Sequence, residues 1–187
     1  MAESDTQTFC RMIRQRSNEN CEAVSVLHDK GLIGLVLGVL RQELDSMVRC
    51  IYLLSIEDRT YRTRLIQDAI NHRRWRTEDR KRLITDKDMV ELSSRLHGWT
   101  QMVYKFGCAF IHLSAYHDYA VRNPLNELSE VDRTSLARYI EQYHGVRLSG
   151  SDSLMSIAAI LPRVFEKITS NLECYLKDLE RDGDLEK

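Results

Sequence analysis

The sequence predicts an all-α protein, a single-domain helical bundle with two long central helices. Its 187 residues include 8 glycines and 2 prolines, too few turn-forming residues for a protein with many strands. Apolar residues recur at steps of three and four along most of the chain, which is the period of an amphipathic helix. A chain of this length forms one sizeable core, and no linker interrupts it. We therefore predict one domain over residues 1–187, with a core over 30–180 and a charged, fraying tail over 180–187.

The composition favours a soluble cytoplasmic protein. The 27 basic and 28 acidic residues nearly cancel, so any affinity for nucleic acid must come from local patches. Five cysteines lie far apart without a CxxC pair, which argues against a disulfide framework and against a zinc site, and we predict no metal or cofactor. The N-terminus lacks the pattern of a signal peptide. The most apolar stretch, residues 31–40, is too short to cross a bilayer core of about 30 Å, so no membrane contact is expected.

Three helical segments are predicted in the first half of the chain. Polar residues at 17–20 make the first segment either one broken helix or two short ones. The second is the central helix, apolar around most of its first half, and it carries Gly34 and Gly38 four residues apart. Because glycine costs about 1 kcal/mol relative to alanine inside a helix, we expect these glycines to allow the close approach of a neighbouring helix. The three segments cover about residues 6–27, 31–56 and 61–70.

Three more helices are predicted in the second half. The longest begins at a cap formed by residues 85–88, bends at Gly98 or Gly107, and ends before Asn123-Pro124, since the residue before proline is pushed out of the helical conformation. Pro162 should kink the last helix or mark a break in it. The three helices cover about residues 85–119, 129–145 and 154–179.

Polar and reactive side chains gather near the end of the predicted long helix. Lys105 and His112 are seven residues apart, so a continuous helix would place them on one face, and Tyr116 and Tyr119 would extend that stripe. A cation, an imidazole and phenols on one face are able to bind a phosphate and transfer a proton. The alternative interpretation is that His112 is a hydrogen-bonded structural residue. The second histidine, His117, lies on another side of the helix, a poor geometry for chelating a metal.

A stripe of alternating charge follows the central helix. Arg41, Asp45 and Arg49 succeed one another at four-residue steps. Such a stripe is either an exposed ladder of ion pairs, each contributing a few tenths of a kcal/mol, or one wall of a cleft shared with the helix that carries His112.

The strongest basic patch is the segment of residues 72–82, referred to below as the basic segment. It holds six Arg or Lys residues against two acids and includes one tryptophan, Trp75. Its arginines are suited to phosphates, and an indole stacks on nucleic-acid bases. The alternative is a solvated loop with Trp75 packed against the core. The predicted RNA-binding residues are Arg49, Arg73, Arg74, Trp75, Arg76 and Arg80.

Residues 39–49 and 103–119, together with Tyr143-His144-Gly145, resemble uncharacterised bacterial helical proteins related to the HEPN superfamily. That superfamily includes ribonuclease toxins, abortive-infection proteins and non-catalytic nucleotide-binding domains. The likeness covers about residues 30–145. It implies a homodimer, and an antitoxin or effector as a partner in a defence or toxin-antitoxin system.

The HEPN hallmark is an arginine followed, after four to six residues, by a histidine. Its best positional match here is Lys105 followed by His112, in which lysine replaces the arginine and cannot form a bidentate contact with phosphate. A second match, Arg138 with His144, keeps the arginine, but its two residues lie on different sides of a short helix.

The resemblance implies metal-independent RNA cleavage, in which the 2′-hydroxyl attacks the adjacent phosphate. In that reaction His112 acts as general acid or base and Lys105, with Arg41 or Arg49, stabilises the charged transition state. Asp45 orients one of these cations.

Two functions are therefore predicted as alternatives. The first is an endoribonuclease with His112, Lys105, Arg41 and Asp45 at its catalytic site. The second is a non-catalytic helical dimerisation module that binds RNA, a nucleotide or a partner protein. A shared electropositive cleft for these residues favours the enzyme, whereas their separation favours the module. The sequence contains no P-loop, Ser-His-Asp or HExxH motif, so other hydrolase classes have no support.

Overall fold

A computed structural model describes residues 3–149 and 151–185 of the chain. Every regular element in these ranges is a helix, which confirms the predicted all-α class, and the two residues Arg76 and Leu83 form an isolated antiparallel bridge. No described helix combines the length and the apolar character needed to cross a membrane. The elements are α1 (Asp5–Asp29), α2 (Ile33–Leu54), α3 (Arg59–Ile70), α4 (Asp86–Leu96), α5 (Thr100–Ile111), the 3-10 helices η1 (Ala115–Asp118) and η2 (Pro124–Glu127), α6 (Glu130–His144), α7 (Leu154–Ala158) and α8 (Leu161–Glu180).

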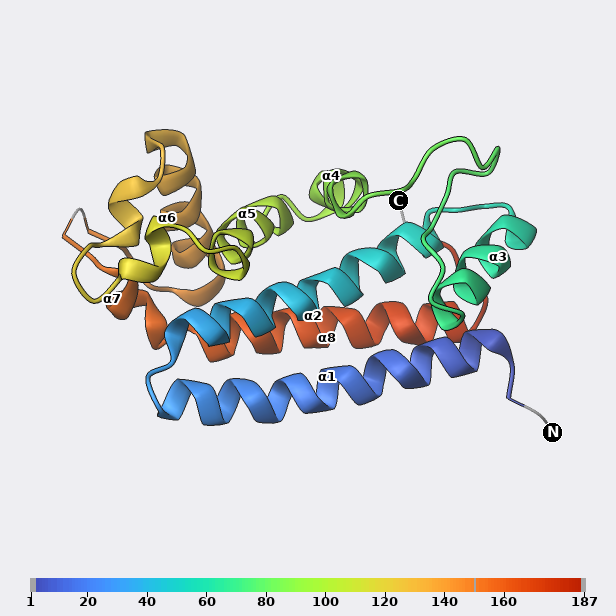
Figure 1. The fold of residues 1–187 in the computed structure, drawn as a ribbon, viewed down its shortest axis with the longest axis horizontal. Helices are drawn as coiled ribbons and strands as arrows, with labels where there is room; N and C mark the ends of the chain where they lie inside the picture. Colours follow the sequence, from blue (N-terminus) through green and yellow to red (C-terminus); the bar gives the residue numbers. More distant parts are fainter. Residues whose placement is uncertain (1–2, 150, 186–187) are drawn as a thin grey trace.

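Helix α2 is the centre of the fold. It packs against α1 and α8 on one side and against α4 and α5 on the other, and Figure 1 shows α1, α2 and α8 side by side as the longest helices. Helix α1 runs in the opposite direction to α2, whereas α8 runs with it (Figure 1). Of the 22 residues of α2, 14 are buried, so this helix contributes to the core around most of its circumference. Its position matches the predicted central helix.

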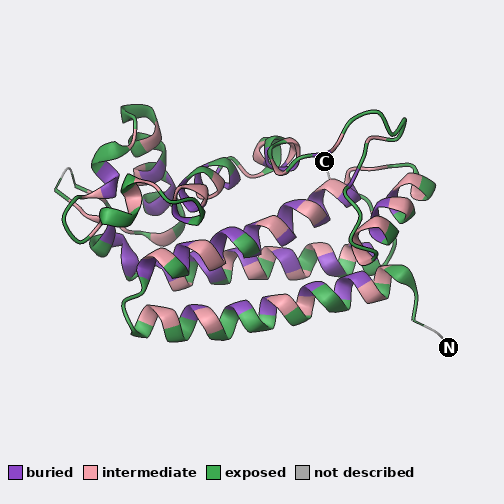
Figure 2. Cartoon of the chain, in the orientation of Figure 1, coloured by how far each residue is buried: buried purple, intermediate pink, exposed green. Residues whose placement is uncertain are grey.

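The core extends beyond the predicted range of residues 30–180. Phe9, Cys10, Ile13 and Val24 of α1 are all buried in the same hydrophobic cluster as α2 and α8. In Figure 2, buried residues mark the inward faces of all three long helices. Helix α1 is therefore part of the bundle.

The polar residues that were expected to interrupt the first helix lie inside one continuous helix, α1. Ser17 and Asn20 are buried, and both donate hydrogen bonds to the carboxylate of Glu43, which is 0% exposed. From α8, the hydroxyl oxygen of Thr169 lies 3.4 Å from Glu43 Oε1, while its proton has a closer acceptor in the Phe165 carbonyl at 3.0 Å. A buried carboxylate requires such donors, so these residues are polar because of a tertiary contact and not because the helix ends there.

The predicted single helix over 85–119 is wrong, because two helices, α4 and α5, occupy this range. They are divided at His97 and Gly98, so Gly98 is the one of the two expected bend positions where the helix is interrupted, whereas Gly107 lies inside α5. His97 has an extended conformation (φ −128°, ψ 88°), which separates α4 from α5. Directly after it, the indole of Trp99 is buried and stacks on Tyr139 of α6, with ring centroids 5.9 Å apart. Burial of this indole favours the break, and the period of apolar residues does not reveal it. Helix α5 ends at Ile111, and Asn123 caps the short helix η2 instead of ending a long one.

The remaining helix predictions agree with the structure to within a few residues. Helix α3 and helix α6 are found where expected, and Gly145 ends α6 in the left-handed conformation (φ 68°). Pro162 lies in the first turn of α8, directly after the break that separates α7 from α8.

The C-terminal segment is fixed to the bundle as far as residue 185, contrary to the predicted fraying. Arg59 of α3 forms ion pairs with Asp182 and Asp184, at 3.1 and 2.7 Å. The buried Arg62 donates to Asp184 at 2.9 Å, and the backbone amide of Leu185 donates to the carbonyl of Leu54. Residues 186–187 of the predicted tail lie outside the described part of the chain.

Among the described glycines, the tightest contact occurs at Gly107 of α5 and not at the two glycines predicted for close approach. A Cβ atom at Gly107 would lie 2.7 Å from the Cβ of Arg41 on α2. At Gly34 the nearest atom, on Tyr119, would be 3.4 Å away, and around Gly38 nothing lies within 4 Å. The absence of a side chain at Gly107 therefore allows the α5 backbone to pack directly against the aliphatic part of the Arg41 side chain.

We expect Gly107→Ala to lower the free energy of unfolding by about 2 kcal/mol. Helix propensity gains about 1 kcal/mol, but overpacking against a Cβ atom that cannot move without its backbone costs about 3 kcal/mol. The matched control Gly38→Ala should raise stability by about 1 kcal/mol, since it adds a methyl group in open space. Urea unfolding followed by circular dichroism measures both, and equal stabilisation by the two substitutions would contradict this packing.

Candidate nucleic-acid interface

Four charged side chains close a ring between α2 and α4. Asp86, the first residue of α4, accepts hydrogen bonds from Arg41 Nη2 at 3.0 Å and from Arg49 Nη2 at 3.1 Å. Arg49 Nε donates to Asp45 Oδ2 at 3.0 Å, and Asp45 Oδ1 lies 3.9 Å from Arg41 Nη1. We call Arg41, Asp45, Arg49 and Asp86 the charge ring. The four-residue spacing along α2 places three members on one stripe, and α4 supplies the fourth.

Arg41 is the most enclosed member of the charge ring, at 6% exposure. Its guanidinium carbon lies 4.2 Å from the centre of the Tyr104 ring, and its Nε donates to Cys108 Sγ at 3.5 Å. Burial by itself would lower the pKa of this guanidinium. The hydrogen bond to Cys108 and the charges of Asp45 and Asp86 reverse that effect and raise the pKa above its ordinary value. Arg41 is therefore a fixed, fully paired cation.

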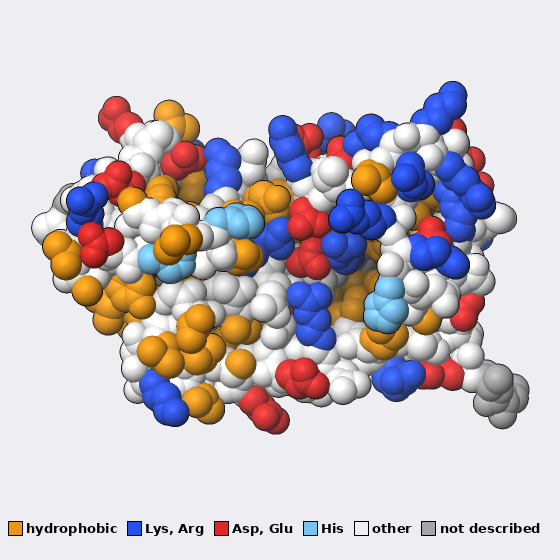
Figure 3. Space-filling view, in the orientation of Figure 1, with side chains coloured by type: hydrophobic (Ala, Val, Ile, Leu, Met, Phe, Trp, Pro, Cys, Tyr) orange, Lys and Arg blue, Asp and Glu red, His pale blue; other side chains and the backbone are white. Residues whose placement is uncertain are grey.

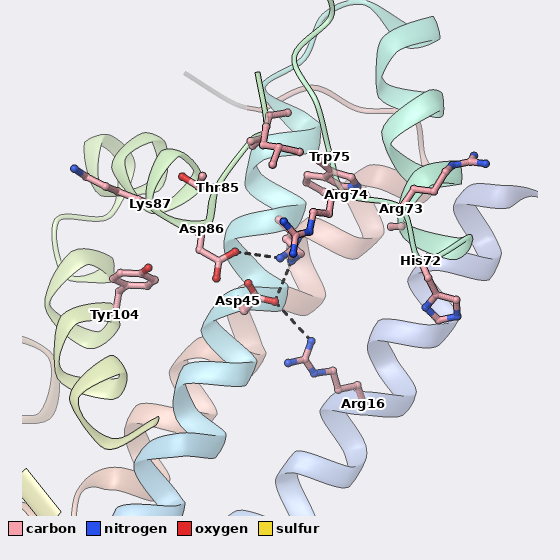
Figure 4. A pocket seen from close by; sticks show the side chains of 14 residues that line it. Arg16, Asp45, His72, Arg73, Arg74, Trp75, Thr85, Asp86, Lys87 and Tyr104 are labelled. Atoms are coloured by element: carbon pink, nitrogen blue, oxygen red, sulfur yellow. Dashed lines mark hydrogen bonds and ion pairs between the residues drawn. The ribbon is translucent and has the colours of Figure 1, made fainter. Parts of the chain in front are cut away.

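A further arginine reaches the charge ring from α1. Arg16 Nη1 lies 3.7 Å from Asp45 Oδ2 (Figure 4). At this distance the contact is an ion pair without a hydrogen bond, and the Arg16 side chain is 41% exposed. Three helices thus contribute to one electrostatic cluster in which arginines outnumber aspartates.

A cavity of about 750 Å³ opens beside the charge ring. We call it the ring cavity. Its lining comes from α1, α2, the end of α3, the basic segment and the starts of α4 and α5. Figure 4 shows Arg16 reaching from α1 toward the carboxylate of Asp45, with Asp86 beside it. Among the lining residues are five arginines or lysines but only two carboxylates: Arg16, Arg49, Arg73, Arg74 and Lys87 against Asp45 and Asp86.

A second cavity, of about 720 Å³, adjoins the first and shares Arg73, Arg74 and Leu83 with it. We call it the α3 cavity because Arg64 of α3 forms one side of it. Together the two cavities are lined by eight cations and three aspartates, and we refer to this surface as the basic face. Figure 3 shows its blue side chains gathered on the upper right of the molecule. The cations are Arg16, Arg49, Arg64, Arg73, Arg74, Arg76, Arg80 and Lys87, and the acids are Asp45, Asp68 and Asp86.

The basic segment is held in place by Trp75 within it and by Ile84 just after it. Trp75 is 3% exposed, and the backbone amide of Ile84 donates to its carbonyl oxygen at 3.0 Å. Tyr61 and Arg64 of α3 donate to backbone carbonyls within the loop. Of the two interpretations of Trp75, the structure shows the one in which the indole packs on the core. Burial of Trp75 fixes the loop, so its neighbours Arg73, Arg74 and Arg76 remain exposed.

The predicted catalytic pair is not brought to this surface. Lys105 points to α6, where its Nζ pairs with Asp132 at 3.2 Å, and Asp132 has a lowered pKa because of its hydrogen bonds to Ser129 and Lys105. His112 follows the last residue of α5 and is exposed. Neither residue lines the ring cavity. The expectation that the polar stripes of both helices meet in one cleft is therefore wrong, because α5 ends before the His112 stripe can continue.

The second motif match also lies apart from the basic face. Both residues belong to α6, where Arg138 is exposed and His144 is half-buried. His144 Nε2 lies 3.2 Å from the Tyr139 hydroxyl. Burial and the nearby cations Lys167 and Arg163 lower the pKa of His144, which favours the neutral imidazole.

Two members of the electrostatic cluster were missed from the sequence. Asp86 was interpreted only as part of a helix cap, and Arg16 was assigned no role. The signal for Asp86 was indirect: Arg41 and Arg49 share one stripe with a single acid between them, which leaves room for a second acid from another element. No pattern around Arg16 points to its contact with Asp45.

Comparison of this chain with protein-family models, curated proteins and solved structures finds no match. The HEPN resemblance and the homodimer that it implies remain predictions.

We expect Asp86→Asn to lower the free energy of unfolding by about 1–2 kcal/mol, because it removes one of the two carboxylates that compensate the buried Arg41. Removing one partner of a buried ion pair costs about 3–5 kcal/mol, and the 41% exposure of the Asp86 side chain reduces that effect. As a control, Glu91→Gln on the exposed side of the same helix breaks only a surface pair with Lys87 and should change stability by less than about 0.5 kcal/mol. Chemical unfolding compares them, and equal effects would contradict a structural role for the charge ring.

Proposed function

We propose that this protein binds RNA through the basic face and does so without cleaving it. The observation that carries the proposal is the charge of that surface: eight cations and three aspartates line two adjoining cavities in a chain whose formal net charge is −1. Phosphates are attracted to such a local patch whatever the net charge of the protein. The HEPN resemblance favours RNA over DNA as the polyanion.

The geometry of the basic segment supports this proposal. Trp75 and Ile84 are both held in the core. The loop between them presents Arg76 and Arg80 at the surface, and Arg73 and Arg74 lie directly before Trp75. Arg74 forms no ion pair among the described residues, and Arg73 pairs only with Asp68 at an exposed site. Cations at such sites bind phosphates without breaking a buried contact, which keeps the cost of binding low.

The placement of the predicted catalytic residues supports binding over cleavage. General acid-base catalysis requires a histidine within hydrogen-bond reach of the reacting group, next to cations that stabilise the transition state. His112 is exposed at the end of α5, Lys105 is paired with Asp132, and Arg41 is enclosed in the charge ring. These three residues therefore lie in different surroundings and do not form one catalytic site.

For the binding activity, we expect Arg73→Gln/Arg74→Gln to weaken the affinity for single-stranded RNA and to make its salt dependence shallower. Loss of two phosphate contacts should reduce the slope of log K against log salt by about 1.4. Fluorescence anisotropy at several salt concentrations measures both quantities, with DNA of the same sequence as a second ligand.

The matched control is Arg133→Gln/Arg163→Gln, which removes two exposed arginines from α6 and α8, outside the basic face. It should leave the slope and the affinity unchanged. An equal loss with both double variants would indicate a response to total charge and would contradict a binding role for the basic face.

For the alternative activity, we expect no RNA cleavage by the purified protein in the presence of a chelator. His112→Ala should behave as the wild type does in a gel assay with labelled RNA. Cleavage by the wild type that disappears in His112→Ala, with circular dichroism spectra unchanged, would establish the endoribonuclease instead.

A further inference from the structure

The loop between α3 and α4 forms a closed hairpin, residues 76–83, which we call the basic hairpin. Beside its isolated antiparallel bridge, the backbone amide of Thr77 donates to the carbonyl of Arg82 at 2.9 Å. Arg64 of α3 donates to the carbonyls of Thr77 and Glu78, at 2.9 and 3.1 Å. Figure 1 shows the loop rising beyond α3 and α4 at the upper right of the molecule. Because these contacts fix its shape, the basic hairpin can enter a groove with little loss of conformational freedom.

The tip of the basic hairpin carries an available carboxylate among cations. Glu78 is exposed, borders an open cavity, and its carboxylate forms no ion pair or hydrogen bond with the described residues. The adjacent Asp79, in contrast, accepts hydrogen bonds from the hydroxyl of Thr77 and from the backbone amide of Lys81. A carboxylate repels phosphates and only accepts hydrogen bonds, so Glu78 suits a part of RNA that offers donors. The 2′-hydroxyl groups in the minor groove offer such donors.

Three aromatic rings at the basic face are already covered by arginines. A guanidinium lies over one face of each ring, within the distance of a cation–π contact. Trp75 is buried, and Tyr61 and Tyr104 are half-buried. The pairs, with the distance from guanidinium carbon to ring centre, are Arg41 on Tyr104 at 4.2 Å, Arg49 on Trp75 at 5.3 Å and Arg64 on Tyr61 at 4.8 Å. Proteins that hold a single strand stack its bases on aromatic rings, so rings engaged in this way favour a ligand whose bases stay paired.

We propose that the basic hairpin enters the minor groove of an RNA duplex, where Glu78 accepts hydrogen bonds from 2′-hydroxyl groups. The inference rests on the proposed function and names double-stranded RNA as the form that the basic face takes. The minor groove of A-form RNA is wide and shallow and displays the 2′-hydroxyls, so the tip of a hairpin reaches them. The phosphates that border the groove then meet the arginines of the α3 cavity, of which Arg76 and Arg80 belong to the hairpin itself.

The test measures the affinity of Glu78→Ala and Glu78→Gln for an RNA duplex by fluorescence anisotropy. We expect Glu78→Ala to bind about fivefold more weakly, because a lost hydrogen bond to a charged group costs about tenfold and one screened repulsion removed returns about twofold. Glu78→Gln keeps an acceptor oxygen and should stay within about twofold of the wild type. The matched control Glu22→Ala removes an exposed acid from α1, outside the basic face, and should leave the affinity unchanged.

A DNA duplex of the same sequence is the second ligand, since it lacks the 2′-hydroxyl. The wild type should bind it more weakly than the RNA duplex, and Glu78→Ala should bind it as tightly as the wild type or slightly more tightly. Simple attraction between charges predicts tighter binding of both duplexes by Glu78→Ala, so the sign of the change separates contact in the groove from contact with phosphates alone.

The outcomes distinguish this inference from the proposed function. Unchanged or tighter binding of the RNA duplex by Glu78→Ala overturns the groove contact and leaves RNA binding intact, and so does an equal loss of affinity for the DNA duplex. A wild type that prefers single-stranded RNA, and loses this preference in His72→Ala, would place a base on the exposed imidazole of His72 and would overturn the duplex as ligand. Failure of every RNA to bind contradicts the proposed function itself.

Discussion

The interaction on which the rest of this structure depends is the enclosure of the Arg41 guanidinium between α2, α4 and α5. A charge at 6% exposure is tolerated only when it is paired and hydrogen-bonded, and three elements supply what it needs. Tyr104 covers it, Gly107 makes room for its stem, and Asp86 compensates its charge. These contacts fix the position of the first turn of α4 on α2. The basic segment, which leads directly into that turn, is positioned as a consequence.

The same pairing explains how a protein with balanced charge presents one strongly basic surface. Within the charge ring, two arginines and two aspartates neutralise one another and hold α2 and α4 together. The arginines of the basic segment have no equivalent partners in the core, because the loop is anchored by Trp75 and by backbone hydrogen bonds instead. The charge ring contributes Arg49, Asp45 and Asp86 to the lining of the ring cavity, and the exposed arginines of the basic segment add the positive charge on which the proposed RNA binding rests.

The predicted Lys105–His112 motif in α5 is not formed by the structure. Lys105 and His112 satisfy the spacing of a cation and a histidine on one helix face, yet the helix ends at Ile111 and Lys105 pairs with Asp132. A spacing rule holds only while the helix continues. Arg138 and His144 show the complementary case: both lie on α6, but His144 contacts Tyr139 and is not directed to the basic face.

The sequence by itself determined the all-α class, the central helix, the boundaries of α3 and α6, the end of α8, and the existence of a basic segment, because local periodicity, capping residues and composition encode these features. Tertiary structure alone decided the rest. In the sequence, Ser17 and Asn20 look like an interruption of the first helix, but in the structure both hydrogen-bond to the buried carboxylate of Glu43 inside a continuous helix. The division between α4 and α5 accompanies the burial of Trp99 against Tyr139. Asp86 pairs with Arg49 of α2, 37 residues away in the sequence, and Arg16 pairs with Asp45 of α2, 29 residues away. At such separations the spacing of residues along the chain does not predict contacts.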